Sequence, residues 1–173
     1  MYKQKLCLSL SQSFGISYEE QIKLFKKTGF DGCAIDLSDK NADAASLAIK
    51  IKEEGMIIPY LHAPFNKSDD MWMDGEIGDV ALAELLDCLE LCSKSDIPAM
   101  VVHAFIGFDN EINPTDIGIA RYGALAVRAK ELGITLAIEN TEGEEYLFAL
   151  MEKLKDIDSV AFCWDSGHEL CYN

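Results

Sequence analysis

The sequence lacks the features that several large classes of protein require. It has no basic run, and its 15 lysines and arginines stand against 30 aspartates and glutamates, which leaves a formal charge of −15. Proteins that grip nucleic acid neutralise phosphates with clustered Lys and Arg, so we expect no nucleic-acid partner. The first turn after an apolar run, LSQSFGIS, has no G-x-G-x-x-G loop, and no Walker sequence occurs elsewhere. A dinucleotide-binding sheet is therefore disfavoured.

Long apolar runs and a cysteine framework are missing as well. No stretch approaches the roughly 18 consecutive apolar residues of a membrane span, and the N-terminal MYKQKLCLSLSQSFG is too polar for a signal peptide. Six cysteines are scattered without paired spacing, and an intracellular chain of this size normally keeps them reduced. We expect a cytoplasmic protein without disulfides or a membrane segment.

What the chain does contain is an alternation of short apolar runs and helical patterns. Six runs have the composition and length of strands buried on both faces: KLCLSLS, DGCAIDLS, MIIPYLHA, PAMVVHAF, ITLAIENT and SVAFCWDS. Between them, Ser17 and Glu20 have capping-box spacing, and Gly29, Gly55 and Gly133 stand where helices end, as left-handed C-caps do. This repeated order predicts βαβ units with a parallel sheet.

Two parallel architectures fit this alternation, a doubly wound open sheet and a closed (β/α)₈ barrel. Polar residues end the last five predicted strands, and in a barrel such ends form one catalytic rim: Asp36, His62, His103, Glu139 and Asp165. We therefore predict an α/β TIM-type barrel, as one domain over residues 1–173. A complete barrel takes about 250 residues, so we expect a C-terminally truncated barrel of about six βα units. Open sheet edges invite association, including homo-oligomers.

The predicted strand ends have the chemistry of a metal site. Imidazole and carboxylate together suit Zn²⁺, Mn²⁺ or another borderline divalent ion. Glu139 ends a buried strand, where an isolated charge is costly without a cation or a partner. Asp165 follows FCW in the same way, and His168 lies three residues further along, so both side chains can reach one cavity. A strand-end hydrogen-bond network is the alternative for each residue singly, but their convergence favours a shared site.

Other candidates have a structural alternative. A lone histidine on an apolar strand, such as His62 or His103, is more often a hydrogen-bonded core residue than a ligand. Asp36 either reaches the pocket floor or caps the following loop. Trp72 lies in a long predicted loop, residues 65–79, where it either walls a sugar pocket or covers the barrel mouth. We keep all four as candidate substrate-binding residues.

These motifs resemble those of the xylose isomerase-like TIM-barrel superfamily, which holds sugar phosphate isomerases and epimerases and metal-dependent apurinic endonucleases. FCWDSGHE is similar to the sixth-strand F-x-x-D-[ST]-G-H signature, and GFDGCAIDLS, LHAPF, VVHA and IEN are similar to strands two to five. The resemblance implies that Glu139 and Asp165 bind a divalent metal (Mn, Zn, Co or Mg), that Glu139 is also an acid or base, and that His168 contacts substrate. It implies that His62 and His103 line the pocket in sugar enzymes or bind metal in endonucleases.

The resemblance therefore implies a sugar or sugar-phosphate isomerase or epimerase that uses a divalent metal and carboxylate proton transfer. The superfamily's remaining ligands, a seventh-strand histidine and an eighth-strand glutamate, have no counterpart in these 173 residues. An inactive barrel fragment or binding domain is therefore the second interpretation. An apurinic endonuclease is the third, and the acidic charge disfavours it.

Overall fold

The structure, a computed structural model, describes residues 4–38, 42–107 and 113–172. Within these ranges six parallel strands form one sheet, in which each strand pairs with the next along the chain. The strands are β1 (Cys7–Ser9), β2 (Gly32–Asp36), β3 (Leu61–His62), β4 (Ala99–His103), β5 (Thr135–Glu139) and β6 (Val160–Cys163). The predicted parallel α/β sheet is therefore confirmed.

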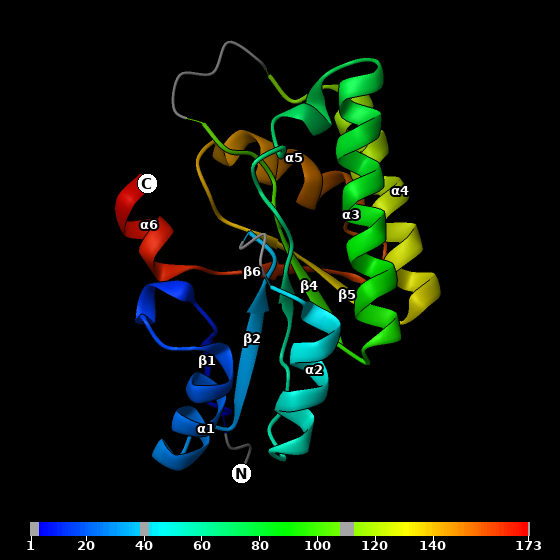
Figure 1. The fold of residues 1–173 in the computed structure, drawn as a ribbon. Coiled ribbons are helices and arrows are strands. Elements are labelled where there is room, and N and C mark those ends of the chain that lie inside the picture. Colours follow the sequence, from blue (N-terminus) through cyan, green and yellow to red (C-terminus); the bar gives the residue numbers. More distant parts are fainter. Residues whose placement is uncertain (1–3, 39–41, 108–112, 173) are drawn as a thin grey trace.

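Helices follow the strands and pack on the outside of the sheet (Figure 1). The α-helices are α1 (Tyr18–Thr28), α2 (Ala44–Glu53), α3 (Glu76–Lys94), α4 (Asp116–Leu132), α5 (Glu144–Leu154) and α6 (Ser166–Tyr172), with two short 3-10 helices, η1 (Gln12–Phe14) and η2 (Asp70–Trp72). Neighbouring helices contact one another, α1 with α2, α3 with α4, and α4 with α5. This arrangement of parallel strands inside and helices outside is that of a TIM-type barrel.

Local sequence signals set the helix ends. The Ser17 hydroxyl accepts the Glu20 amide at 3.3 Å while the Glu20 carboxylate accepts the Ser17 amide at 2.9 Å, which is the predicted capping box. Gly29, Gly55 and Gly133 follow α1, α2 and α4 with φ of 92°, 67° and 70°. These left-handed conformations are cheap only for glycine, so the predicted helix ends are confirmed.

The register of the sheet places core residues on one face of the strands and candidate site residues on the other. Ile35, Leu61, Met100 and Leu136 lie side by side across β2 to β5 and all are fully buried. Because side chains alternate between the two faces of a strand, the residues one position further along point to the opposite face. His62 is one such residue, and it is paired with Asp36 of β2.

The sheet is open at β1 and β6, each of which has one strand neighbour among the described residues. Phe162 on β6 and Trp164 just after it are 50% and 64% exposed. In a closed barrel both edges would pair with further strands. The expectation of an incomplete barrel with six βα units is therefore confirmed for the described part of the chain.

The six cysteines carry free thiols in the structure. Cys88 and Cys92 lie one turn apart on α3 and are buried with Leu85 and Leu89 on its apolar face. Burial raises the pKa of both thiols to about 12, so they act as small hydrophobic groups. None of the described helices is long and apolar enough to cross a membrane.

Candidate active site

A polar cavity of about 290 Å³ lies at the carboxyl ends of the strands. The register brings its residues together, because His103 of β4 pairs with Glu139 of β5, and Asp36 of β2 pairs with His62 of β3. Six of the seven candidates from the sequence line this cavity: Asp36, His62, His103, Glu139, Asp165 and His168. The sequence therefore identified most of the polar wall of the pocket.

Glu139 is the centre of the cluster. Its Oε2 atom lies 2.9 Å from His103 Nε2 and 3.2 Å from His62 Nε2, and its Oε1 atom lies 4.0 Å from His168 Nδ1. Burial by itself would raise the pKa of this carboxyl, but the hydrogen bonds from His103 and His62 outweigh burial and lower it to about 2. Glu139 is therefore a carboxylate at neutral pH, held by two imidazoles.

His62 is held from both sides of its ring. Nδ1 lies 2.8 Å from the Ala63 carbonyl oxygen and 3.9 Å from Asp36 Oδ1, while Nε2 faces Glu139. Burial favours the neutral ring, yet the hydrogen bond and charge of Glu139 prevail and raise the pKa of His62. Asp36 Oδ1 also accepts hydrogen bonds from the amide and the hydroxyl of Ser38, at 2.8 and 2.6 Å. It therefore caps its loop and lines the cavity at once.

The end of β6 completes the pocket. Asp165 Oδ1 accepts the amides of Gly167 and His168 at 2.6 and 2.8 Å, which fixes the carboxylate at the start of α6. The turn places His168 Nδ1 2.9 Å from the carbonyl oxygen of Asn140. The DSGH segment therefore presents an aspartate and a histidine to one cavity, as expected from their spacing.

The donor set fits a divalent metal ion. Two groups of three candidate ligands, each with donor atoms within 4.8 Å of one another, share Glu139: His62, His103 and Glu139, and Glu139, Asp165 and His168. Imidazole nitrogen with carboxylate oxygen is the set that Zn²⁺ and Mn²⁺ accept. A cation would also compensate the buried charge of Glu139.

Trp72 is the one candidate that lies outside the cavity. Its side chain is 1% exposed, and its indole nitrogen donates to the Ala104 carbonyl at 2.8 Å. Its ring packs on Tyr146 at 4.8 Å and on Tyr122 at 5.6 Å. The predicted long loop contains the η2 turn, which folds the indole inward, so Trp72 belongs to the core beneath the rim and is not a wall of the pocket.

Several residues of the pocket escaped the sequence interpretation. Tyr60 lines the cavity two residues before His62 and so shares its strand face, a signal that the alternation contained. Phe65 stacks on His103 with ring centres 4.7 Å apart and an interplanar angle of 12°. Glu142 also lines the cavity. It comes from the loop after β5, for which no local pattern predicts a position.

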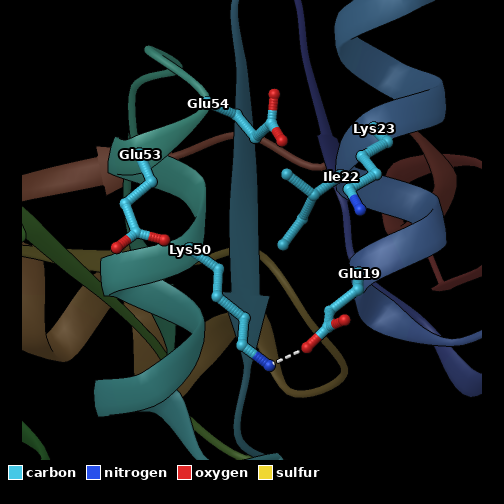
Figure 2. Close-up of a pocket in the computed structure, with 6 residues that line it drawn as sticks. All are labelled: Glu19, Ile22, Lys23, Lys50, Glu53 and Glu54. Atoms are coloured by element: carbon cyan, nitrogen blue, oxygen red, sulfur yellow. Dashed lines mark hydrogen bonds and ion pairs between the residues drawn. The ribbon is translucent and has the colours of Figure 1, made fainter.

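A second cavity lies away from the strand ends, between α1 and α2. Its volume is about 260 Å³, and its walls come from the facing sides of the two helices. Figure 2 shows the ion pair of Lys50 with Glu19 among the residues that line it, which also include Glu53 and Glu54. None of its lining residues belongs to the histidine and carboxylate cluster, so the strand-end cavity is the candidate active site.

Fold and site together define an α/β-barrel protein with a polar, metal-compatible pocket at the carboxyl ends of its strands. A family model described as xylose isomerase-like TIM barrel matches residues 22–173. The chain therefore belongs to the xylose isomerase-like TIM-barrel family, and the resemblance drawn from its motifs is confirmed. No curated protein sequence matches the chain.

Solved structures with the same fold include two sugar epimerases. The D-psicose 3-epimerase of Clostridium cellulolyticum H10 with D-tagatose superposes with a TM-score of 0.77 at 16% identity, over 96% of this chain and 65% of that one. The 3-keto-D-glucoside 4-epimerase of E. coli gives 0.71 at 19% identity, over 97% and 70%. An IOLI protein with a bound zinc atom gives 0.75 at 17%, over 95% and 64%. At such low identities these superpositions show a shared fold and nothing more. The chain spans about 65% of the length of the D-psicose 3-epimerase in the structure with D-tagatose and in a second one, solved in the presence of D-fructose.

Proposed function

We propose that this chain forms the metal- and substrate-binding part of a sugar or sugar-phosphate isomerase or epimerase. The observation that carries the proposal is the Glu139 carboxylate, buried between two imidazoles and close to Asp165 at the carboxyl ends of the strands. Membership of the xylose isomerase-like family and the fold shared with sugar epimerases support it.

We assign Glu139 and Asp165 as ligands of a divalent metal ion, which is Mn, Zn, Co or Mg. A divalent ion held by Glu139 and Asp165 would supply Lewis-acid chemistry, by which a substrate carbonyl would be polarised and the adjacent carbon made more acidic. Glu139 is ionised at neutral pH and, as a ligand and general base, would remove the proton at that carbon. Isomerisation would return this proton to the neighbouring carbon, whereas epimerisation needs a second acid that returns a proton on the opposite face. His168 contacts a substrate oxygen, and Asp36 with His62 and His103 completes the polar wall that orients the hydroxyl groups.

We also assign residues 1–173 to one domain in a cytoplasmic protein. Every described strand belongs to one sheet, and the free thiols suit a reducing compartment. The exposed side chains of Phe162 and Trp164 favour association of the open sheet with a second copy of this chain.

A sugar- or metal-binding domain without catalysis is the second candidate, because the chain spans about 65% of the length of epimerases with its fold. An apurinic endonuclease fits less well. It would need a positive groove for DNA, whereas the formal charge is −15.

Two measurements test these assignments. Metal analysis and calorimetric titration with Mn²⁺ and Zn²⁺ should show binding that Glu139→Gln and Asp165→Asn abolish together. Chromatography of ketohexoses and their phosphates, incubated with the metal-loaded chain, should show epimer formation that chelator stops. Metal and sugar binding without turnover would favour the second candidate, and the absence of both would contradict the whole assignment.

A further inference from the structure

We infer that Tyr60 determines which sugars the strand-end cavity accepts: its side chain forms the floor of the cavity and limits the length of the sugar that fits above it. This inference deepens the proposed function and rests on it. Tyr60 directly precedes β3 and lines the cavity together with Ser9, Asp36 and His62, from the β1–β3 side of the sheet. It therefore stands where it can contact the part of a substrate that lies away from the carboxylates at the ends of β5 and β6.

The register of the first three strands places Tyr60 below the rim of the cavity. Asp36 pairs with His62 at the rim. Two residues earlier on these strands stand Ala34 and Tyr60, and because side chains alternate between the faces of a strand, both face the cavity side. Ala34 pairs in turn with Ser9 of β1. At about 3.3 Å per residue, this row lies about 6–7 Å below the rim.

The side chain of Tyr60 crosses this row from β3 to β1. Its hydroxyl lies 3.4 Å from Ser9 Oγ, although β2 stands between the two strands. Neighbouring strands are about 4.8 Å apart, so the ring extends over Ala34 to reach Ser9. Ala34 is 1% exposed, and its methyl group leaves room for a ring above it. The tyrosine ring therefore closes the interior of the sheet beneath this side of the cavity.

The residues below the rim on the other side of the cavity are small. Ala137 of β5 pairs with Ala161 of β6, and each stands two residues before a residue of the strand end, Glu139 and Cys163. Methyl groups leave the interior open at this level, so Tyr60 supplies the bulk there. Removal of its ring should deepen the cavity, because the small side chains around it cannot fill the space.

A floor at this depth suits a short substrate. The cavity has a volume of about 290 Å³, at the lower end of the range of about 300–1,000 Å³ for small-molecule sites, so it suits one monosaccharide. In the proposed function the reacting carbons lie at Glu139 and Asp165, and the other end of the sugar extends toward Tyr60. A sugar one carbon longer would meet the tyrosine ring. The geometry therefore favours a ketohexose over a ketoheptose.

Two substitutions at Tyr60 test this role. Tyr60→Ala removes the floor, whereas Tyr60→Phe keeps the ring and is the matched control. Calorimetric titration of the Mn²⁺-loaded wild type should show that the ketohexose D-fructose binds about 10-fold or more tightly than the ketoheptose sedoheptulose, as one carbon in a fitted pocket discriminates. This preference should persist in Tyr60→Phe and fall to within about threefold in Tyr60→Ala. An unchanged preference in Tyr60→Ala would overturn the inference.

p-Cresol, which has the size and shape of the tyrosine side chain, tests the floor without a sugar. It should bind Tyr60→Ala, because a cavity left by a removed ring can take up a ligand of the same shape. It should bind neither the wild type nor Tyr60→Phe, in which the ring occupies the space. Saturation-transfer nuclear magnetic resonance measures this binding. Equal binding to all three chains would show that Tyr60 does not fill the floor.

Nuclear Overhauser effects in the wild-type chain give a readout that needs no variant. The ring protons of Tyr60 should show contacts with the methyl group of Ala34, and their absence would overturn the inference even if Tyr60→Ala failed to fold. Absence of any ketose binding by the wild type would instead count against the proposed function, while p-cresol and the ring contacts would still decide whether Tyr60 forms the floor.

Discussion

Asn140 and Asp165 hold each other across the ends of β5 and β6. The Asn140 side chain donates to the Asp165 carbonyl oxygen at 2.9 Å and accepts the Asp165 amide at 2.6 Å. The Asn140 carbonyl oxygen in turn contacts His168 Nδ1 at 2.9 Å. One asparagine therefore sets the position of a candidate metal ligand and of a candidate substrate contact.

Replacing this asparagine should loosen the β6 side of the site. Asn140→Ala removes two hydrogen bonds to the Asp165 backbone, so we expect a loss of about 1–3 kcal/mol of unfolding free energy and a Zn²⁺ affinity about 10-fold lower. Urea denaturation and chelator competition measure the two effects. Asn66→Ala, in an exposed turn, is the matched control. Unchanged affinity in Asn140→Ala would show that Asp165 does not depend on this contact.

The charge of Glu139 should make the stability of the metal-free protein depend on pH. Its folded-state pKa of about 2 lies below the ordinary 4.5, so its stabilising effect is present above about pH 4.5 and is lost as the pH falls toward 2. The pKa of His62 is raised, so its contribution is present at low pH and is lost as the pH rises through that raised value.

The difference in unfolding free energy between wild type and Glu139→Gln should therefore peak between these limits. The shift of Glu139 from 4.5 to about 2 sets an upper bound of about 3 kcal/mol. Urea denaturation in chelator, between about pH 2 and pH 9, measures the profile. A difference that does not vary with pH would contradict the ion pairs seen around Glu139.

Metal should stabilise the folded chain through Asp165. At a free Zn²⁺ concentration about 100 times the dissociation constant, we expect about 2.7 kcal/mol of added unfolding free energy in the wild type. Asp165→Asn should lose most of this increment, whereas Asp87→Asn, at an exposed position on α3, should keep it. Chemical denaturation with and without ZnCl₂ is the measurement, and an equal increment in both variants would remove Asp165 from the ligand set.

A larger side chain at Gly118 should destabilise the core beneath the site. A Cβ at this position of α4 would overlap the indole of Trp72, so Gly118→Ala should destabilise the fold by about 1–3 kcal/mol. Gly123→Ala lies on the same helix, where the added carbon meets Leu154 at an ordinary 3.7 Å, and it should stabilise by up to about 1 kcal/mol. Thermal denaturation compares the two. If Zn²⁺ affinity fell with Gly118→Ala while stability did not, Trp72 would have a role in the site after all.

The exposed edge at β6 should drive self-association. Phe162 and Trp164 are 50% and 64% exposed there, and exposed apolar groups beside an open strand favour pairing with another chain. Sedimentation velocity should show a concentration-dependent dimer that weakens in the double variant Phe162→Ser, Trp164→Ser. Phe148→Ser, equally exposed on α5, should leave it unchanged. A monomeric wild type at all concentrations would disprove the expectation.

Much of the site could be predicted because its signals are local. His103 and Glu139 each end an apolar run, and the parallel sheet pairs them directly. Asp165 and His168 lie within one turn of α6. Parallel strands send their carboxyl ends to one rim, so the positions followed from the order of the strands.

Other parts needed contacts between distant segments. Trp72 is a surface candidate in its loop, but it is buried because Tyr146, 74 positions later, packs on its ring. Asn140 is the last residue of the IEN motif, but the motif does not predict its partner, and only the pairing of β5 with β6 brings its amide to Asp165.

The sequence by itself determined the strands, the helix caps and the ring of polar strand ends, because periodicity and capping act between residues a few positions apart. Only the tertiary structure decided which of these residues meet, and how. The contact of His103 with Glu139, the orientation of Glu139 and the burial of Trp72 depend on hydrogen-bond partners and packing surfaces supplied by other strands and helices. Local sequence patterns cannot identify those partners, because the partners lie far away in the sequence and come close only when the chain folds.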